Sequence, residues 1–308
     1  MNALGHFALN TIFVPTSRAP NPDEIAFPVY MNNSGSNTAV KIHCTAGYGG
    51  VPSNVEGMTV HIDPRELPQN GGENGTDDAH WALIDPAGGY EYTLWGTQWP
   101  PQHGGLTAAW GGRCTLSGNG FTNPSYSGGS WNSGCVATAS GTPLSMGIIR
   151  VKDLLAAVQS GGALPQALSY SFGCTGTASQ LPAPFLSGGD GKCAGAQLEG
   201  AHMYLAMHDS QVNALNLPAI TSVLLRTLDE DHYGAFCVDS GGGAAPGILF
   251  NVESDETYAA WGLGSPWLTQ FIPEAQNEGL PVFSDPSNGR DGIPLAIPAS
   301  IGSYVTFL

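Results

Sequence analysis

The sequence has few charged residues, and very few of those are basic. Only 11% of its 308 residues are charged, with 9 Lys and Arg against 25 Asp and Glu, which gives a formal net charge of -16. A surface of that sign repels phosphate backbones and anionic lipid headgroups. The composition therefore argues against nucleic acid as a partner.

Long apolar runs are also missing. No stretch reaches the roughly 18 consecutive apolar residues that a membrane helix requires. The first residues, MNALGHFALNTIFVP, lack the basic and apolar regions of a signal peptide. These features predict a soluble chain with no membrane insertion, from which any export signal is already absent.

The sequence contains no CxxC spacing, no phosphate-binding loop, no dinucleotide fingerprint and no EF-hand spacing. We therefore expect no resident metal and no organic cofactor. Ca²⁺ is the one ion that the sequence leaves open, because it prefers oxygen ligands and three turns are rich in them. These turns are residues 71–78, 187–192 and 284–292.

Glycine and proline are abundant, with 43 and 23 residues. Such residues supply tight turns, which favours strands over helices. We predict a mainly β fold, an antiparallel, jelly-roll-like β-sandwich with two short helices, formed by one domain of residues 1–308. Residues 1–25 would be an extended N-terminal arm, and residues 250–308 a loop-rich C-terminal extension. The helices are expected in IIRVKDLLAAVQ and NLPAITSVLLRTLDED, with Asn216 as the N-cap of the second.

The stretch HWALIDPAGGYEYTLW predicts a β-hairpin. If PAGG forms its loop, Asp85 faces Tyr90 and Leu83 faces Tyr92. Alternation then divides the side chains between two faces of the sheet. One face carries His80, Ala82, Ile84, Glu91, Thr93 and Trp95, and the other carries Trp81, Leu83, Tyr92 and Leu94.

Six cysteines in loop-rich surroundings favour disulfides over a metal site. Pairing Cys114 with Cys135 and Cys174 with Cys193 would close two Gly/Ser-rich loops, which leaves Cys44 with Cys237. This set is one of several that six cysteines allow. Asn32 and Asn74 fit the pattern for N-glycosylation. Together these features predict a secreted, disulfide-stapled protein.

Several segments follow one another in a recognisable order. They are DAHWALIDPAGGYEYTLW, ATASGTPLSMGIIRVKDLLAA, GALPQALSYSF, GAHMYLAMHDSQVNALNLP and LDEDHYGAFCVDSGGG. This order resembles a large family of secreted bacterial proteins, most of which have no assigned chemistry. The resemblance covers roughly half of the chain.

The resemblance implies functional roles for Asp78, His80, Arg150, Tyr233 and Asp239. It does not extend to Gln166, which stands where the family has a histidine. Any chemistry that needs a second imidazole is therefore in doubt.

The predicted hairpin face combines an imidazole, an indole and a carboxylate, which is a suitable surface for a glycan. We expect a polysaccharide-active protein. A glycoside hydrolase needs two carboxyl groups, whereas a lyase needs a base and a group that neutralises a uronate carboxylate. The candidate catalytic residues are His80, Asp78, Glu91 and Asp239, and the candidate substrate-binding residues are Trp95, Tyr92, Arg150 and Tyr233. The alternative is that Trp81, Tyr92 and Trp95 are ordinary sandwich core and that His80 is a structural histidine.

Two other classes of function stay open. A low-charge, disulfide-bonded chain would suit a subunit of an extracellular filament, sheath or adhesive layer, in which a sheet edge or the N-terminal arm pairs with another copy. The stretch FCVDSGGG resembles the nucleophile loop of chymotrypsin-like peptidases, which would make Ser240 a nucleophile with His43 as its base. Self-association of the purified chain would support the structural class. Loss of activity in Ser240→Ala would support the serine hydrolase.

Overall fold

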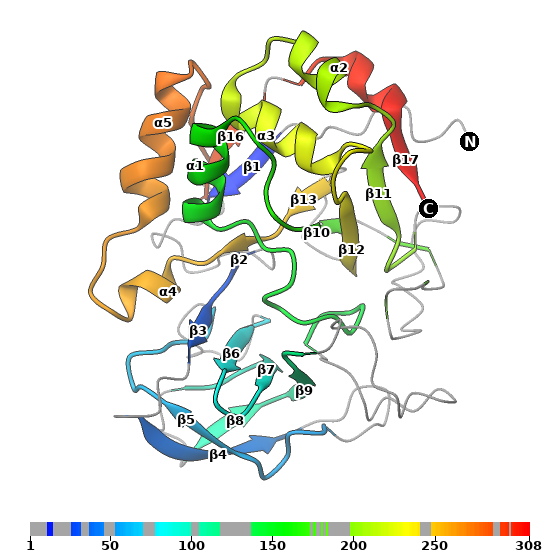
Figure 1. Ribbon diagram of the computed structural model, residues 1–308. Helices are drawn as coiled ribbons and strands as arrows, with labels where there is room; N and C mark the ends of the chain where they lie inside the picture. The colour runs from blue at the N-terminus through cyan, green and yellow to red at the C-terminus, as the bar shows by residue number, and fades with distance from the viewer. Residues whose placement is uncertain are drawn as a thin grey trace.

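In the computed structural model, strands dominate, with a few short helices among them (Figure 1). The structure describes residues 11–14, 26–31, 37–45, 53–69, 78–99, 105–117, 137–172, 175–176, 180, 183, 198–240, 248–285, 290–295 and 297–308. Within these ranges the strands form several mixed sheets and no barrel. The prediction of a mainly β fold is therefore confirmed at this level.

A five-stranded sheet lies in the upper part of Figure 1. Its strand order is β13 (Ile248–Phe250), β10 (Leu168–Phe172), β12 (Ala235–Ser240), β11 (His202–Leu205) and β17 (Val305–Phe307). The central pair, β10 and β12, is parallel, and the other three pairings are antiparallel. The predicted antiparallel arrangement is thus wrong for the middle of this sheet. Residues 173–234 connect β10 to β12, and a connection of this length allows the two strands to run parallel.

The helices gather around this sheet (Figure 1). They are α1 (Val151–Ser160), α2 (Asp209–Ala214), α3 (Ala219–Leu228), α4 (Glu256–Ala259) and α5 (Ile272–Asn277), with a π turn, η2 (Trp267–Phe271), and a 3₁₀ helix, η3 (Ala299–Tyr304). In α3 the apolar side chains recur at helical spacing and are buried. The two predicted helices correspond to α1 and α3, but Pro218 and not Asn216 is the N-cap of α3.

Two further sheets form the lower part of the molecule in Figure 1. One has the order β3 (Val29–Met31), β6 (Trp81–Asp85), β7 (Tyr90–Trp95) and β9 (Trp110–Thr115), and the other has the order β5 (Thr59–Ile62), β4 (Thr38–Cys44) and β8 (Leu106–Ala108). β6 and β7 pair in the predicted register, with Asp85 opposite Tyr90 and Leu83 opposite Tyr92. Both sheets also contain a parallel pairing, β3 with β6 and β4 with β8.

Both faces of the β6–β7 hairpin are covered. Trp81, Leu83 and Leu94 pack in a core that also contains residues of the second lower sheet, such as Ile42. On the opposite face, Ala82 packs in a separate core. The segments that cover this second face contribute Phe27, Val29, Ala137, Leu144 and Ile148. The face predicted to bind a glycan is therefore interior.

The segments near the two ends of the chain are more ordered than the sequence suggests. Within the predicted N-terminal arm, β1 (Thr11–Val14) pairs with β16 (Arg290–Pro294), which also pairs with β15 (Phe283–Asp285). Short strands β2 (Ala26–Phe27) and β14 (Val252–Glu253) pair in parallel. The predicted loop-rich extension also contains Trp267 and Phe271, which are fully buried in the largest core.

The cysteines do not bear out the predicted pairing of Cys44 with Cys237. Both carry thiols, and they lie on strands of different sheets, β4 and β12. Cys114 is disulfide-bonded, but no disulfide joins two of the residues that the structure describes. Cys135, Cys174 and Cys193 lie outside the described residues, as do the glycosylation candidates Asn32 and Asn74. Nor does the described part of the chain include a helix of the length and apolarity that crossing a membrane requires.

Candidate functional site

His80 lies in the interior, with 1% of its surface exposed. Its Nε2–H donates to the carbonyl oxygen of Ala137 at 2.8 Å, since a carbonyl can only accept. Its Nδ1 lies 3.3 Å from the Oε1 of Gln69, and its ring makes an edge contact with Phe27 at a centroid distance of 5.0 Å. Contrary to the sequence prediction, His80 therefore does not lie on a surface that a glycan could reach.

Burial also sets the protonation state of this imidazole. Removal from water lowers the pKa of His80, while the charge of Asp78 and the hydrogen bond to Ala137 act in the opposite direction. Burial therefore favours the neutral ring, and its contacts join the start of β6 to the segment at residue 137. These are the properties of a structural histidine.

Glu91, another candidate catalytic residue, is also buried, with 3% of its surface exposed. It accepts hydrogen bonds from the backbone N–H of Ser145 at 3.0 Å and from the hydroxyl of Ser145 at 2.5 Å. Burial raises the pKa of Glu91, and the bonds from Ser145 and the charge of Arg150 offset part of this rise. The carboxylate therefore holds the segment before α1 against β7.

Asp78 and Trp95 are the pair of predicted site residues that the structure joins directly. The indole Nε1–H of Trp95 donates to Oδ1 of Asp78 at 2.6 Å, across the ends of the hairpin. Because this bond occupies the polar edge of the ring, it fixes the indole in place. The pair is half-buried and so does not by itself form an open sugar platform.

The other predicted site residues are dispersed. Tyr92 packs in the core between the lower sheets, Arg150 is the N-cap of α1, and Tyr233 is 50% exposed just before β12. The backbone of Asp239 pairs with that of Ser171 in β10, and the side chains of Asp239 and Ser240 lie outside the described set. Gln166, at the divergent position, donates to the carbonyl of Ile148 at 2.9 Å.

The two residues of the suggested serine–histidine pair lie on different sheets. Ser240 ends β12 of the upper sheet, whereas His43 lies in β4 of a lower sheet. The exposed ring of His43 contacts Glu56, with 3.1 Å between Nδ1 and Oε1. The base suggested for Ser240 is therefore held in a pair of its own.

An open groove that the sequence did not single out lies beside α4. Its volume is about 550 Å³. It lies between the loop that follows β5 and the turn that ends α4. Its lining residues are Pro64, Arg65, Leu67, Glu256, Ala259, Ala260, Trp261 and Gly262.

Arg65 and Trp261 form a fixed platform at this groove. The guanidinium carbon of Arg65 lies 4.5 Å from the centre of the Trp261 ring, and 40% of Trp261 is exposed. Asp63 holds Arg65 through two bonds, from Nε at 2.8 Å and from Nη2 at 2.7 Å. The bonds from Arg65 also lower the pKa of Asp63 to about 2. The result is an aromatic and cationic surface whose cation is held by Asp63.

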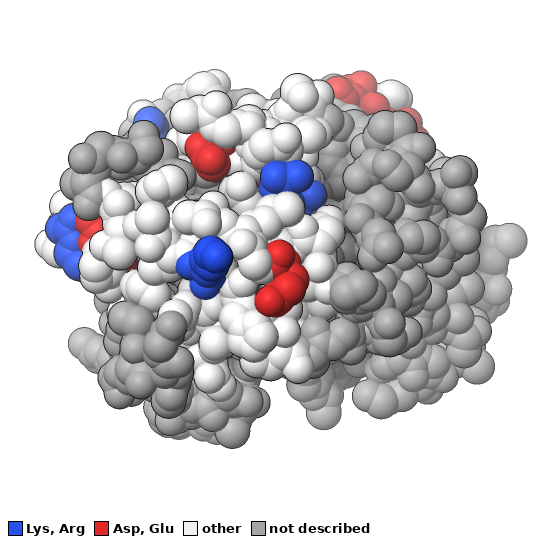
Figure 2. Space-filling view, turned by 90° about the horizontal axis from the view of Figure 1, so that it is seen from below, with Lys and Arg blue, Asp and Glu red and all other residues white. Residues whose placement is uncertain are grey.

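The charged residues elsewhere on the lower part of the molecule are scattered. Figure 2, which views the molecule from below, shows Lys and Arg interspersed with Asp and Glu among uncharged residues on the described atoms of that face. No basic patch gathers there that would attract a polyanion.

The chain matches no protein-family model, no curated protein and no solved structure. The resemblance to a family of secreted bacterial proteins therefore stays a prediction. The groove was missed because its residues come from two segments about two hundred positions apart. The one sequence signal for it is Trp261, an aromatic residue next to Gly262 and Gly264.

Proposed function

We propose that this protein is a secreted polysaccharide-binding protein and that sugar rings occupy the groove beside α4. The observation that carries the proposal is the stacking of Arg65 against Trp261, with Arg65 held by Asp63. A pre-fixed aromatic surface binds a ring without losing side-chain freedom on binding. The predicted β-sandwich, formed by the two sheets that share the lower core, would be its scaffold.

The chemistry of the groove suits a neutral polysaccharide. The indole of Trp261 offers an apolar surface for the C–H face of a sugar, and the N–H groups of Arg65 and the carboxylate of Glu256 can bond hydroxyls. The net charge of -16 disfavours polyuronates and sulfated glycans. We therefore expect glucans, mannans or xylans to bind better than pectate or alginate.

The test is binding of the full chain to a panel of neutral and acidic polysaccharides by affinity electrophoresis and calorimetry. Trp261→Ala should weaken binding roughly tenfold or more, as expected for an aromatic residue at the centre of a binding site. Tyr304→Ala is the matched control, since Tyr304 is similarly exposed, at 39%, but lies in η3. Equal affinity of the wild type and Trp261→Ala would refute the groove assignment.

Catalysis is a separate part of the proposal. Hydrolysis needs two carboxyl groups, and among the described residues Glu256 is the one acid that lines the groove. We therefore favour a binding function over hydrolysis or elimination of the polysaccharide. Release of oligosaccharides from the panel, lost in Glu256→Gln, would extend the function to a hydrolase or lyase.

A structural subunit is the second candidate, and one observation favours it. β17 is at the edge of the upper sheet, pairs with β11 on one side, and is followed by Leu308, which is 66% exposed. Such an edge can accept a strand from another copy. Sedimentation of the purified chain tests this candidate, because a filament subunit would form large assemblies and a binding protein would stay small.

A further inference from the structure

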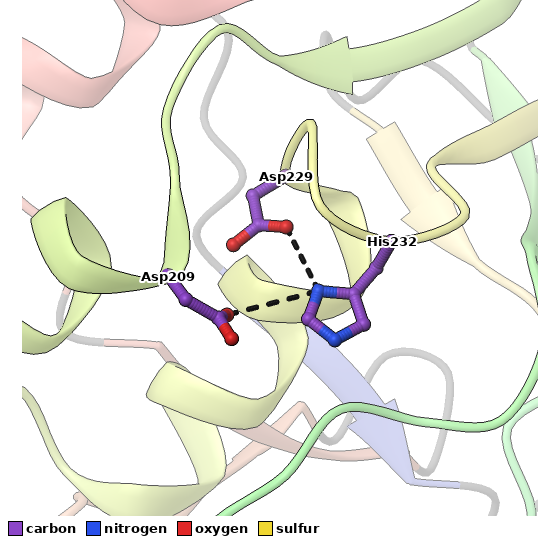
Figure 3. Close-up of side chains that lie close together, drawn as sticks. All are labelled: Asp209, Asp229 and His232. Carbon is purple, nitrogen blue, oxygen red and sulfur yellow. Dashed lines mark hydrogen bonds and ion pairs between the residues drawn. The ribbon is translucent and has the colours of Figure 1, made fainter.

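A second group of functional side chains lies in the upper part of the molecule, away from the groove. Asp209 begins α2, while Asp229 and His232 lie in the turn that follows α3. Figure 3 shows the two carboxylates and the imidazole directed toward one another. One ligand atom from each residue lies within 4.8 Å of the others.

The geometry of this cluster centres on the Nδ1 of His232. This nitrogen is 2.9 Å from Oδ1 of Asp229 and 3.7 Å from Oδ1 of Asp209. The backbone N–H of Asp231 also donates to Oδ1 of Asp229, at 3.0 Å. The turn therefore fixes the Asp229 carboxylate by two bonds to one of its two oxygens.

Two carboxylate oxygens of the cluster lack a hydrogen bond, and one of them is the Asp209 Oδ1 that lies 3.7 Å from His232. The Oδ2 of Asp229 and the Oδ1 of Asp209 are enclosed, and no N–H or hydroxyl group donates to either. The side chain of Asp229 is 0% exposed. A buried carboxylate oxygen without a donor is costly, unless a proton or a cation occupies the space beside it.

The surroundings add negative charge to the cluster. Glu230 and Asp231 follow Asp229 directly, so four carboxylates share this corner of the molecule with two imidazoles. His208 contacts Asp231 at 3.1 Å and Glu230 at 3.8 Å. No Lys or Arg of the described chain forms an ion pair with these acids. A divalent cation would supply the missing positive charge.

A second layer of bonds keeps Asp209 in position. Its backbone N–H donates to Oδ2 of Asp231 at 2.9 Å, and Oδ1 of Asp231 contacts Nδ1 of His208. Residues that orient ligands in this way are typical of metal centres. The arrangement is thus fixed from both α2 and the turn after α3.

We propose that Asp209, Asp229 and His232 form a binding site for a divalent transition-metal ion. The donor set of two carboxylates and one imidazole is suited to Zn²⁺ or Mn²⁺, whereas Ca²⁺ takes oxygen ligands and more of them. On binding, the proton on Nδ1 of His232 moves to Nε2 or to solvent, and the ion takes its place between the carboxylates. This site is independent of the proposed glycan groove.

The competing explanation is a proton shared by Asp209 and Asp229. Calorimetric titration of the EDTA-treated full chain with ZnCl₂, and separately with MnCl₂, distinguishes the two. The metal site predicts saturable binding of one ion per chain. Absence of binding of both ions at millimolar concentration leaves the shared proton as the explanation and overturns the proposal.

Substitutions of the proposed ligands test where the ion binds. Asp209→Asn and His232→Gln change partly exposed side chains and should each weaken binding roughly tenfold or more. The matched control is His43→Gln, which removes an imidazole paired with a carboxylate elsewhere, at 3.1 Å from Glu56. Circular dichroism checks that the variants fold. Undiminished affinity in both site variants, or loss of binding in the control, contradicts the proposed ligands.

X-ray absorption of the Zn²⁺-loaded chain gives a readout that does not depend on substitution. The proposed site should give nitrogen and oxygen neighbours only. Sulfur among the neighbours would assign the ion to a thiol such as that of Cys44 and overturn the proposal.

Discussion

The Nε2–H of His80 donates a hydrogen bond to the carbonyl oxygen of Ala137 at 2.8 Å, and the two residues are 57 positions apart in the sequence. This contact closes the segment at residue 137 over the β6–β7 hairpin. It also explains why a residue that resembles a catalytic base has no access to solvent. His80 therefore acts on the stability of the fold.

His80→Ala should lower the free energy of unfolding by about 2–4 kcal/mol, because it leaves a cavity and removes the bond to Ala137. Denaturant unfolding measures this change. Glycan binding per folded molecule should stay unchanged. A variant as stable as the wild type but inactive on a glycan would return His80 to the catalytic residues.

The lowered pKa of His80 also predicts a pH dependence. Below about pH 6.5 the unfolded chain binds a proton at this residue that the folded chain does not, so its contribution to stability falls as the pH decreases. His80→Gln should reduce this acid-side loss in unfolding curves recorded from about pH 7 to about pH 5. An unchanged slope would argue against a neutral buried ring.

Glu66 predicts a dependence of the opposite sign. It is 0% exposed, and burial raises its pKa to about 7. The folded chain therefore keeps a proton that the unfolded chain loses above its ordinary pKa of about 4.5, and stability falls as the pH rises from there to about 7. Glu66→Gln should reduce the fall by roughly 2–3 kcal/mol. Glu56→Gln, at an exposed position, is the control. It should not reduce the fall in the free energy of unfolding between about pH 4.5 and about pH 7.

Arg65→Lys tests the platform without removing its charge. Lysine cannot make the two parallel bonds to Asp63 or lie flat on the indole of Trp261. We expect roughly a tenfold loss of glycan affinity and, because the bonds from Arg65 are gone, a rise in the pKa of Asp63. Calorimetry and NMR titration of the carboxyl group measure these effects. Full affinity in the lysine variant would mean that charge alone is sufficient.

Cys44 and Cys237 should differ in reactivity. Cys44 is half-buried and burial raises its pKa, so it should be alkylated slowly in the folded protein. Cys237 is 0% exposed and should react only after unfolding. Mass spectrometry of peptides alkylated before and after denaturation checks both. A peptide that joins the two cysteines would contradict this and restore the pairing expected from the sequence.

Gly234 is expected to be intolerant of substitution. Its φ of 68° is in the left-handed region, and an added Cβ would lie 2.6 Å from the carbonyl oxygen of Met203 and even closer to the ring of His202. Gly234→Ala should cost about 2–4 kcal/mol of unfolding free energy. Gly161→Ala has a similar φ of 65° with open space around it, and should cost about 1 kcal/mol. Equal losses of unfolding free energy in the two variants would show that the left-handed backbone conformation, and not contact with the added Cβ, causes the destabilisation.

The local elements of the fold could be predicted from the sequence. The PAGG turn and the alternation around it determine the register of β6 and β7, and apolar spacing determines α3. The mixed sheets could not be predicted, because pairings such as β4 with β8 join strands separated by about sixty residues, and no local pattern specifies them.

The candidate site was harder to predict for a related reason. Alternation places Glu91 and Trp95 on one face of the hairpin, but it does not reveal that Phe27 and Leu144 cover that face. Asp209 and Asp229 lie twenty positions apart and meet only because α2 and α3 fold back on each other. The consecutive acids before His232 are the one sequence signal for that cluster.

The pairing of β1 with β16 has a practical consequence for how the chain can be shortened. Strand residues 11–14 have their partner at residues 291–294, near the opposite end of the chain. Deleting everything after about residue 289 would thus also detach the beginning of the protein from its sheet. Trimmed versions for crystallisation should keep both strands or omit both.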